Sequence, residues 1–178
     1  MERFVRGCYM IVGGWTMSET KKIFLGSSSL NVFGPRCPSC GNPGRPVKAN
    51  TLRSLLLPEK RDNIKDHGYY FCSSAVCDTV YFAGNGEYVF TRNYLTVRVG
   101  VKEASSPRPI CYCFDHTVEE IDEDVRLTGK SLVIEDIKER MKNEGCSCET
   151  RNPQGACCLK TVERYVRETL VRYGISVE

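Results

Sequence analysis

Apolar residues in the middle of the chain fall in short runs that are rich in aromatic and β-branched side chains. Turn-forming Gly and Asn residues separate these runs, a pattern that is typical of strands joined by tight turns. We therefore expect a small antiparallel sheet between residue 36 and about residue 97. The predicted strands lie at residues 69–71, 79–82, 88–90 and 94–97.

Beyond residue 109 the spacing of apolar residues becomes helical. Val118, Ile121 and Val125 recur at intervals of three and four behind Thr117, which forms a capping-box pattern with Glu120. The same spacing predicts a second helix over 131–143 and a last helix over 159–173. Gly145 and Gly174 are placed to end these two helices.

This change of period predicts an α+β fold with a β-rich subdomain at 36–100 and a helical subdomain at 101–178. Two prolines and two serines within 101–109 are typical of a linker. Residues 1–35 have no sustained apolar period, so we expect an appended segment that metal binding does not need. Cys8 is expected to be an ordinary thiol of that segment.

Cysteine is the residue type that changes this picture, because 11 of the 178 residues are cysteines. The stretch 7–18 has no charge but is too short to cross a bilayer, and no signal-peptide pattern is present. We therefore expect a cytoplasmic protein without a membrane span. In that compartment clustered cysteines favour metal binding over disulfides.

Charge and motif content exclude several classes of function. The 25 Lys and Arg residues nearly balance the 22 Asp and Glu residues, giving a net charge of +3. Nucleic acid is therefore not an expected partner. With two histidines and no glycine-rich phosphate loop, the sequence offers no hydrolytic or group-transfer site, and no catalytic residue is predicted.

The first four-cysteine set has the spacing of two metal-binding knuckles, at Cys37 and Cys40 and then at Cys72 and Cys77. Four thiolates in a closed tetrahedral site suit structural zinc. Mononuclear iron is an alternative, since spacing alone does not select the metal. Two unrelated pairs of thiols are the other alternative. His67 is not needed as a ligand and is expected in solvent.

The second group of cysteines lies in the helical half and consists of three pairs, whose two members are adjacent or separated by one residue. Such neighbours are poor disulfide partners but can reach the irons of a small iron-sulfur cluster. Its members are Cys111, Cys113, Cys146, Cys148, Cys157 and Cys158. His116 suggests a Rieske-type site, which needs two histidines on one iron and is therefore disfavoured. Tyr112 is expected to shield the site.

Several of these motifs in one order resemble the N-terminal domain of the archaeal CopZ copper chaperone family. The second cysteine set is also similar to the helical fold of bacterioferritin-associated ferredoxins. The resemblance covers about residues 36–173. The matching segments are 37–40, 70–77, 80–82, 98–103, 111–113 and 152–158. Proteins of this family continue into a domain with a Met-x-Cys-x-x-Cys copper loop, and no such loop occurs in residues 1–178.

The resemblance implies a Zn²⁺ ion and a 2Fe-2S cluster in one chain. Zinc falls on Cys37, Cys40, Cys72 and Cys77. The cluster falls on Cys111, Cys113, Cys148 and Cys158, where Cys158 is preferred to Cys157 because it immediately precedes a helix in both related patterns. Cys146 and Cys157 are then spare thiols, which suit cuprous copper.

The resemblance also implies single-electron transfer, including reduction of cupric to cuprous copper in copper handling. The expected partners are a protein electron donor or acceptor, copper ions and a copper-transport protein. Any enzymatic activity is limited to this electron transfer. The alternatives are a module in which two metals staple small subdomains for an interaction, and a redox sensor whose cluster state alters a binding surface.

Overall fold

The computed structural model describes residues 34–176, and it confirms an α+β architecture. The expected appended segment, apart from its last two residues, and Cys8 lie outside the described residues. The first half holds β1 (Arg45–Val47), α1 (Ala49–Leu55), α2 (Pro58–Arg61), β2 (Tyr69–Phe71), β3 (Thr79–Ala83), β4 (Val89–Thr91) and the 3-10 turns η1 (Arg92–Tyr94) and η2 (Gly100–Lys102). The second half holds β5 (Pro109–Cys111), β6 (His116–Thr117), α3 (Val118–Thr128), α4 (Val133–Glu144), α5 (Cys148–Arg151) and α6 (Leu159–Arg172).

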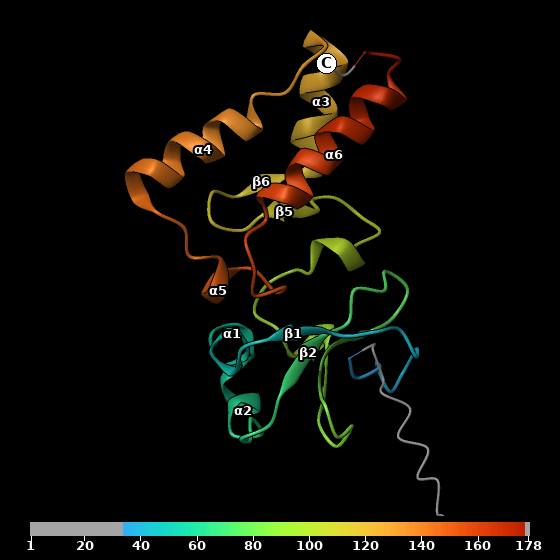
Figure 1. Ribbon diagram of the computed structural model, residues 1–178, viewed down its shortest axis with the longest axis vertical. Coiled ribbons are helices and arrows are strands. Elements are labelled where there is room, and N and C mark those ends of the chain that lie inside the picture. The colour runs from blue at the N-terminus through green and yellow to red at the C-terminus, as the bar shows by residue number, and fades with distance from the viewer. Residues whose placement is uncertain (1–33, 177–178) are drawn as a thin grey trace, which may run out of the picture. The chain divides into compact units, whose positions relative to one another are not determined.

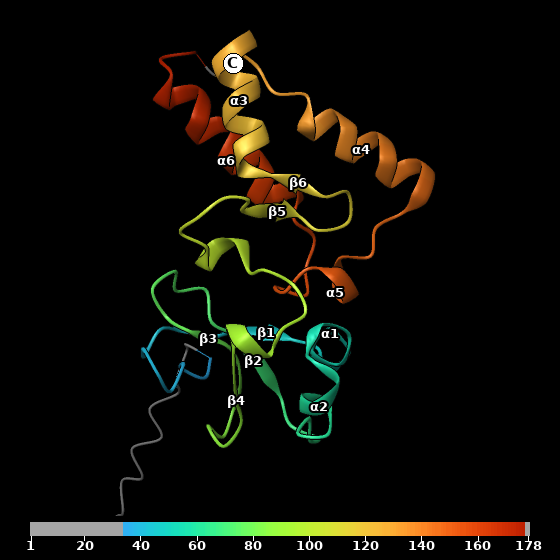
Figure 2. The ribbon, with the colours of Figure 1, turned by 180° about the vertical axis from the view of Figure 1, so that it is seen from behind.

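The sheet of the first half has the order β1-β2-β3-β4, with every neighbouring pair antiparallel (Figures 1 and 2). All five residues of β3 are buried. Aromatic side chains of β2 and β3 pack with leucines of α1 and the turn that follows it, which gives this half an apolar core of its own. The runs predicted at 69–71, 79–82 and 88–90 correspond to β2, β3 and β4.

The strand predicted at 94–97 was wrong. Residues Arg92–Tyr94 form η1, and Leu95 makes only an isolated bridge with Leu56. The Leu57 amide donates to the Tyr94 carbonyl and the Thr96 amide to the Leu55 carbonyl. Residues 94–96 therefore pair with the end of α1 in place of a strand of the sheet.

The helices of the second half follow the predicted spacing. The Thr117 hydroxyl caps α3 by accepting the Glu120 amide at 3.2 Å, while the Glu120 carboxylate contacts His116. Gly145 ends α4 and Gly174 follows α6, both with a positive φ that favours glycine. The predicted helices at 131–143 and 159–173 are confirmed with boundaries shifted by one or two residues. None of the helices among residues 34–176 is long and apolar enough to cross a membrane.

Residues 98–109, expected to include a linker, pack closely on both halves. The Gly100 amide donates to the Tyr112 hydroxyl at 2.8 Å. A Cβ on Gly100 would lie 1.8 Å from the Pro109 carbonyl oxygen, so only glycine fits there. Near the end of the segment, Glu119 of α3 accepts the Arg108 amide and guanidinium at 2.9 and 2.8 Å.

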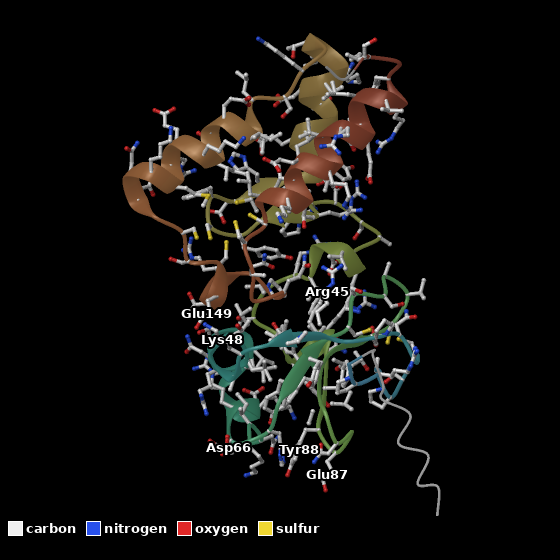
Figure 3. The ribbon with its side chains drawn as sticks, in the orientation of Figure 1. Arg45, Lys48, Asp66, Glu87, Tyr88 and Glu149 are labelled. Atoms are coloured by element: carbon white, nitrogen blue, oxygen red, sulfur yellow. The ribbon has the colours of Figure 1, made fainter. Side chains whose placement is uncertain are left out.

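Residues 149–155 contact the first half directly. Tyr81 of β3, which is fully buried, donates its hydroxyl to the Pro153 carbonyl at 2.8 Å. Lys48 forms an ion pair with Glu149 on the surface beside it (Figure 3), where α5 lies next to α1. The two halves therefore share contacts between residues that are 72 and 101 positions apart in the chain.

Candidate metal centres

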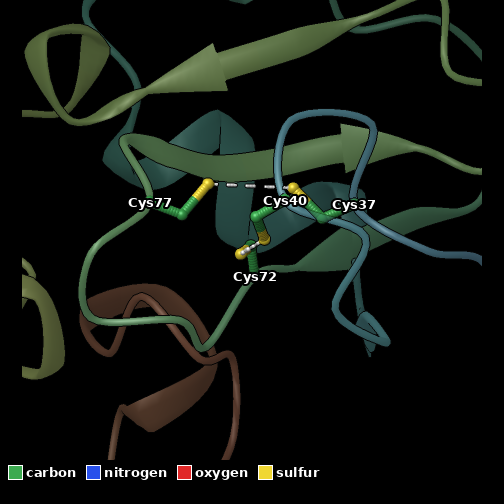
Figure 4. A group of neighbouring side chains, drawn as sticks. All are labelled: Cys37, Cys40, Cys72 and Cys77. Carbon is green, nitrogen blue, oxygen red and sulfur yellow. Dashed lines mark hydrogen bonds between the residues drawn. The ribbon is translucent and has the colours of Figure 1, made fainter.

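The first cysteine set is gathered into one compact group. The sulfurs of Cys37, Cys40, Cys72 and Cys77 all lie within 4.8 Å of one another (Figure 4). The Sγ atoms of Cys37 and Cys77 are 4.0 Å apart, and those of Cys40 and Cys72 are 3.6 Å apart. A tetrahedron with Zn–S bonds of about 2.3 Å requires sulfurs about 3.8 Å apart. The two shorter distances therefore match the spacing of a tetrahedral zinc site.

Backbone amides support the same reading of this set. The sulfurs of three of its cysteines accept hydrogen bonds from the amide two residues later in the chain. The Asn42 amide lowers the pKa of the Cys40 thiol to about 7, whereas burial raises the pKa of Cys72 to about 12. Such donors favour thiolate sulfur and orient it toward a metal. These amides belong to Asn42 after the turn at Gly41, to Ser74 in the loop from Cys72 to Cys77, and to Thr79 at the start of β3.

Two further sets of contacts hold the segments that carry these four cysteines in place. The Ser39 and Thr79 hydroxyls lie 2.7 Å apart and join the first knuckle to β3. Lys102 is buried and donates from Nζ to the carbonyls of Ser74 and Cys77. No sequence pattern distinguishes Lys102 from the other lysines, because its burial depends on how η2 folds back onto the loop. His67 is exposed, as expected, and stacks on Tyr88.

The second cysteine set lies in the apolar core of the helical half. Cys111, Cys113, Cys148 and Cys158 are each at most 8% exposed and pack with Ile121, Ile137 and Val162. The Sγ atoms of Cys113 and Cys148 are 3.4 Å apart. Within residues 34–176, no group but the first set brings three or more ligand atoms so close to one another. The structure therefore gathers these four cysteines in one core, but their sulfurs do not form as compact a group as those of the first set.

Hydrogen bonds link the sulfurs of the second set in a row. Side-chain hydrogen bonds with Cys158 lower the pKa of the Cys111 thiol to about 6 and that of the Cys148 thiol to about 5, and the same contacts raise the pKa of Cys158. Burial raises the pKa of Cys113 to about 12. The Ser147 amide donates to the Cys113 sulfur at 3.3 Å. Cys158 is also the N-cap of α6, where the helix dipole favours negative charge.

The two cysteines considered spare differ from these four in exposure. Cys146 and Cys157 are exposed, although each is within two residues of a buried cysteine. Cys158 is 3% exposed, which accords with its preference over Cys157. The assignment of ligands within this pair stays a prediction.

The neighbouring polar residues have other partners. Nδ1 of His116 lies 2.9 Å from Glu120 and its Nε2 lies 2.9 Å from Asp136, so both ring nitrogens are engaged by carboxylates. This arrangement leaves no nitrogen for a Rieske-type iron. The Tyr112 hydroxyl accepts the Gly100 amide and donates to the Arg98 carbonyl. Tyr112 therefore positions the loop between two cysteines of the second set.

This chain is similar to known zinc-binding and copper-chaperone proteins. A family model described as a zinc binding domain, of the CopZ type, matches residues 34–96. The copper chaperone CopZ of Archaeoglobus fulgidus is 36% identical over 129 residues, which are 72% of this chain and 60% of that relative. The chain thus spans about three fifths of the length of that curated relative.

A solved structure covers more of the described chain. The crystal structure of the N-terminal domain of Archaeoglobus fulgidus CopZ is similar with a TM-score of 0.60 and 34% sequence identity. The match covers 80% of this chain and 99% of that one. At this identity and coverage the likeness extends beyond the zinc-binding half to the helical half. The chain therefore belongs to the family of CopZ N-terminal domains.

Proposed function

We propose that this protein is a zinc- and 2Fe-2S-containing electron-transfer protein of copper handling. Two sets of four cysteines, one with tetrahedral spacing and one buried in the helical core, carry this proposal. The zinc ligands are Cys37, Cys40, Cys72 and Cys77. The cluster ligands are Cys111, Cys113, Cys148 and Cys158. We expect a cytoplasmic location.

The zinc site is structural in this proposal. Four protein sulfurs complete a tetrahedron and leave no position for a substrate. The zinc-side sulfurs contact Phe82 of the sheet, and only a small apolar group surrounds them. Zinc binding and the folding of this loop region are therefore coupled.

The second site suits one-electron chemistry. A bound 2Fe-2S cluster supplies storage for one electron, taken from a protein donor and given to a cupric ion, which becomes cuprous. The chain keeps water from the four sulfurs by burying them among apolar side chains. The Ser147 amide and the start of α6 stabilise negative charge there. These groups are already in place, so an added electron requires little rearrangement.

Copper as the electron acceptor is inferred from the family, since the related Archaeoglobus fulgidus protein is named a copper chaperone. Two features of this chain support the inference. Cys146 and Cys157 are exposed thiols beside the proposed cluster ligands, and thiolates prefer cuprous copper. We propose that they receive the reduced ion before a copper-transport protein takes it.

Metal analysis tests the assignment of the two sites. Anaerobically purified protein should contain about two irons, two acid-labile sulfides and one zinc per chain. Cys113→Ser or Cys148→Ser should bleach or shift the visible spectrum and retain zinc. Cys158→Ser should do the same, and Cys157→Ser should not. A spectrum that survives Cys158→Ser but is lost with Cys157→Ser would overturn that choice.

Reoxidation by copper tests the function. Protein reduced with dithionite, freed of reductant and mixed anaerobically with a cupric salt should regain its oxidised spectrum as one cuprous ion forms per cluster. Sulfide analysis must show that the cluster is intact. The double variant Cys146→Ser with Cys157→Ser should be reoxidised normally but retain less cuprous copper after gel filtration.

The other outcomes separate the alternatives. Reoxidation by a protein electron carrier but not by cupric ion would leave general electron transfer and remove the copper assignment. If neither reacts, the metals only staple the two halves together. In that case the protein is an interaction module.

A further inference from the structure

Lys102 is a buried lysine that contacts the zinc-side loop from the segment joining the two halves. Only 3% of its surface is exposed. Its Nζ donates to the Ser74 carbonyl at 2.7 Å and to the Cys77 carbonyl at 2.9 Å, and it lies 5.9 Å from the centre of the Phe71 ring. Both carbonyls belong to the loop that carries the second cysteine pair. The ammonium group therefore contacts the backbone of the loop that carries this pair.

No carboxylate oxygen among residues 34–176 forms an ion pair with this ammonium group. Glu103, the next residue in the sequence, pairs with Arg98, and Asp78, which follows Cys77, pairs with Arg92. The two carbonyls that accept from Lys102 carry no net charge. Burying an unpaired charge is costly, so a negative group must offset it.

The proposed zinc centre supplies that negative charge. Four thiolates around one Zn²⁺ ion carry a net charge of −2. The Cys77 carbonyl that accepts from Lys102 belongs to one of the four proposed zinc ligands, so the ammonium group lies close to that centre.

The backbone around Lys102 connects this contact to the second cysteine set. Lys102 closes η2, where its amide donates to the Val99 carbonyl at 2.7 Å. The same turn presents the Gly100 amide to the hydroxyl of Tyr112, which lies between two cysteines of the helical half. The guanidinium of Arg92 donates to the Lys102 carbonyl at 2.9 Å. A change at the Lys102 side chain is therefore transmitted to this turn.

We propose that Lys102 is the counter-charge of the zinc–thiolate centre and that, when zinc is bound, this pairing docks η2 and thereby positions the Cys111–Cys113 loop. Lys102 is a positioning residue in this account, because it acts through the zinc loop and touches neither metal. The inference rests on the zinc assignment proposed above.

The test compares Lys102→Met with two other variants. Methionine keeps most of the side-chain volume and removes the charge. Lys65→Met is the matched control, because Lys65 also donates to a backbone carbonyl, that of Asp62 at 3.1 Å, but is exposed. Lys102→Arg keeps the charge. Zinc affinity is measured by competition with a chelator, and thermal stability is measured with zinc bound and after its removal.

We expect Lys102→Met to raise the zinc dissociation constant at least tenfold. Lys65→Met should stay within twofold of the wild type and Lys102→Arg within threefold. Without zinc the buried charge has lost its partner, so Lys102→Met should leave the metal-free protein as stable as the wild type or more stable. A role in packing alone would instead destabilise both forms equally, and that result overturns the proposal.

Hydrogen exchange of residues 99–112 tests the link to the second set. With zinc bound, Lys102→Met should speed exchange of this segment at least fivefold, and zinc removal should do the same in the wild type. Unchanged exchange in the variant rejects the docking role. If the metal-free protein is unfolded, Lys102→Arg decides, because a tenfold loss of zinc affinity in that variant also rejects a charge-based role.

Failure of the zinc assignment gives a different result. A wild-type protein that holds no zinc by elemental analysis, or holds it equally well after Cys40→Ala, contradicts the proposed function before Lys102 is tested. A wild type that binds one zinc ion through the first set, with unchanged affinity in Lys102→Met, contradicts only the role of Lys102.

Discussion

Removing one hydroxyl group, in Tyr81→Phe, tests whether the two halves depend on each other. The hydroxyl of this fully buried residue donates to the Pro153 carbonyl at 2.8 Å, and Pro153 is itself buried. Loss of the donor leaves a buried carbonyl without this hydrogen bond, which costs about 1–3 kcal/mol. Because about 1.4 kcal/mol corresponds to a tenfold change in an equilibrium, the turn at 152–155 should open roughly 5 to 150 times more often.

Hydrogen exchange measures this opening at the turn itself. The Gly155 amide donates to the Asn152 carbonyl and the Gln154 amide to the Asn152 side chain, so both amides report on it. Exchange at these positions should accelerate by that factor in Tyr81→Phe, with both metals retained. Tyr70→Phe is the control, since Tyr70 is a half-buried neighbour in β2 whose hydroxyl forms no hydrogen bond with residues 34–176. Exchange within twofold of the wild type, or equal acceleration in the control, would refute the reasoning.

Two further substitutions have consequences that follow from the contacts. Gly155→Ala should destabilise the protein by about 2–5 kcal/mol in chemical unfolding, because φ is 63° and the new Cβ would lie 2.8 Å from Val47 and 2.9 Å from Thr51; a loss below 1 kcal/mol would contradict the packing. Burial raises the pKa of Glu119, but hydrogen bonds from Arg108 outweigh it and lower this pKa to about 2 from an unperturbed value of 4.5. The stabilisation from the ionised Glu119 carboxylate is present above about pH 4.5 and is lost as the pH falls toward 2. At neutral pH, Glu119→Gln should therefore lower the free energy of unfolding by about 1–2 kcal/mol after allowing for solvent screening. The difference in urea midpoint between Glu119→Gln and the wild type should be constant between about pH 7 and 5.5 and should narrow below about pH 4.5. A difference that does not change with pH would contradict the role of the Glu119 carboxylate.

Sequence patterns predicted the parts of this fold whose residues repeat locally. The helical spacing of Val118, Ile121 and Val125 needs no information from elsewhere in the chain, and α3 forms where it was expected. The strand predicted at 94–97 failed because a strand also needs a sheet partner, and among residues 34–176 this stretch makes only an isolated bridge from Leu95 to Leu56. Composition alone cannot supply that information.

The candidate sites were also predictable only in part from the sequence. Cysteine spacing predicted the first set, which the structure gathers into one compact group. The burial of Lys102 was not predictable, since a lysine that follows Gly100 and precedes the two serines and two prolines of 105–109 has the composition of an exposed linker. Its environment depends on the carbonyls of Ser74 and Cys77, about 25 residues earlier in the chain.

The contact between Tyr81 and Pro153 spans 72 residues, and this separation has a consequence for synthesis on the ribosome. All four strands of the sheet and α1 emerge before the turn that completes their surface. Until Pro153 is made, the buried hydroxyl of Tyr81 lacks its partner, and Thr51 lacks the covering Gly155. Contacts of such long range also slow folding, because the intervening chain must close first. The first half can thus bind zinc early, but it reaches its final state only after more than half of the remaining chain has been translated.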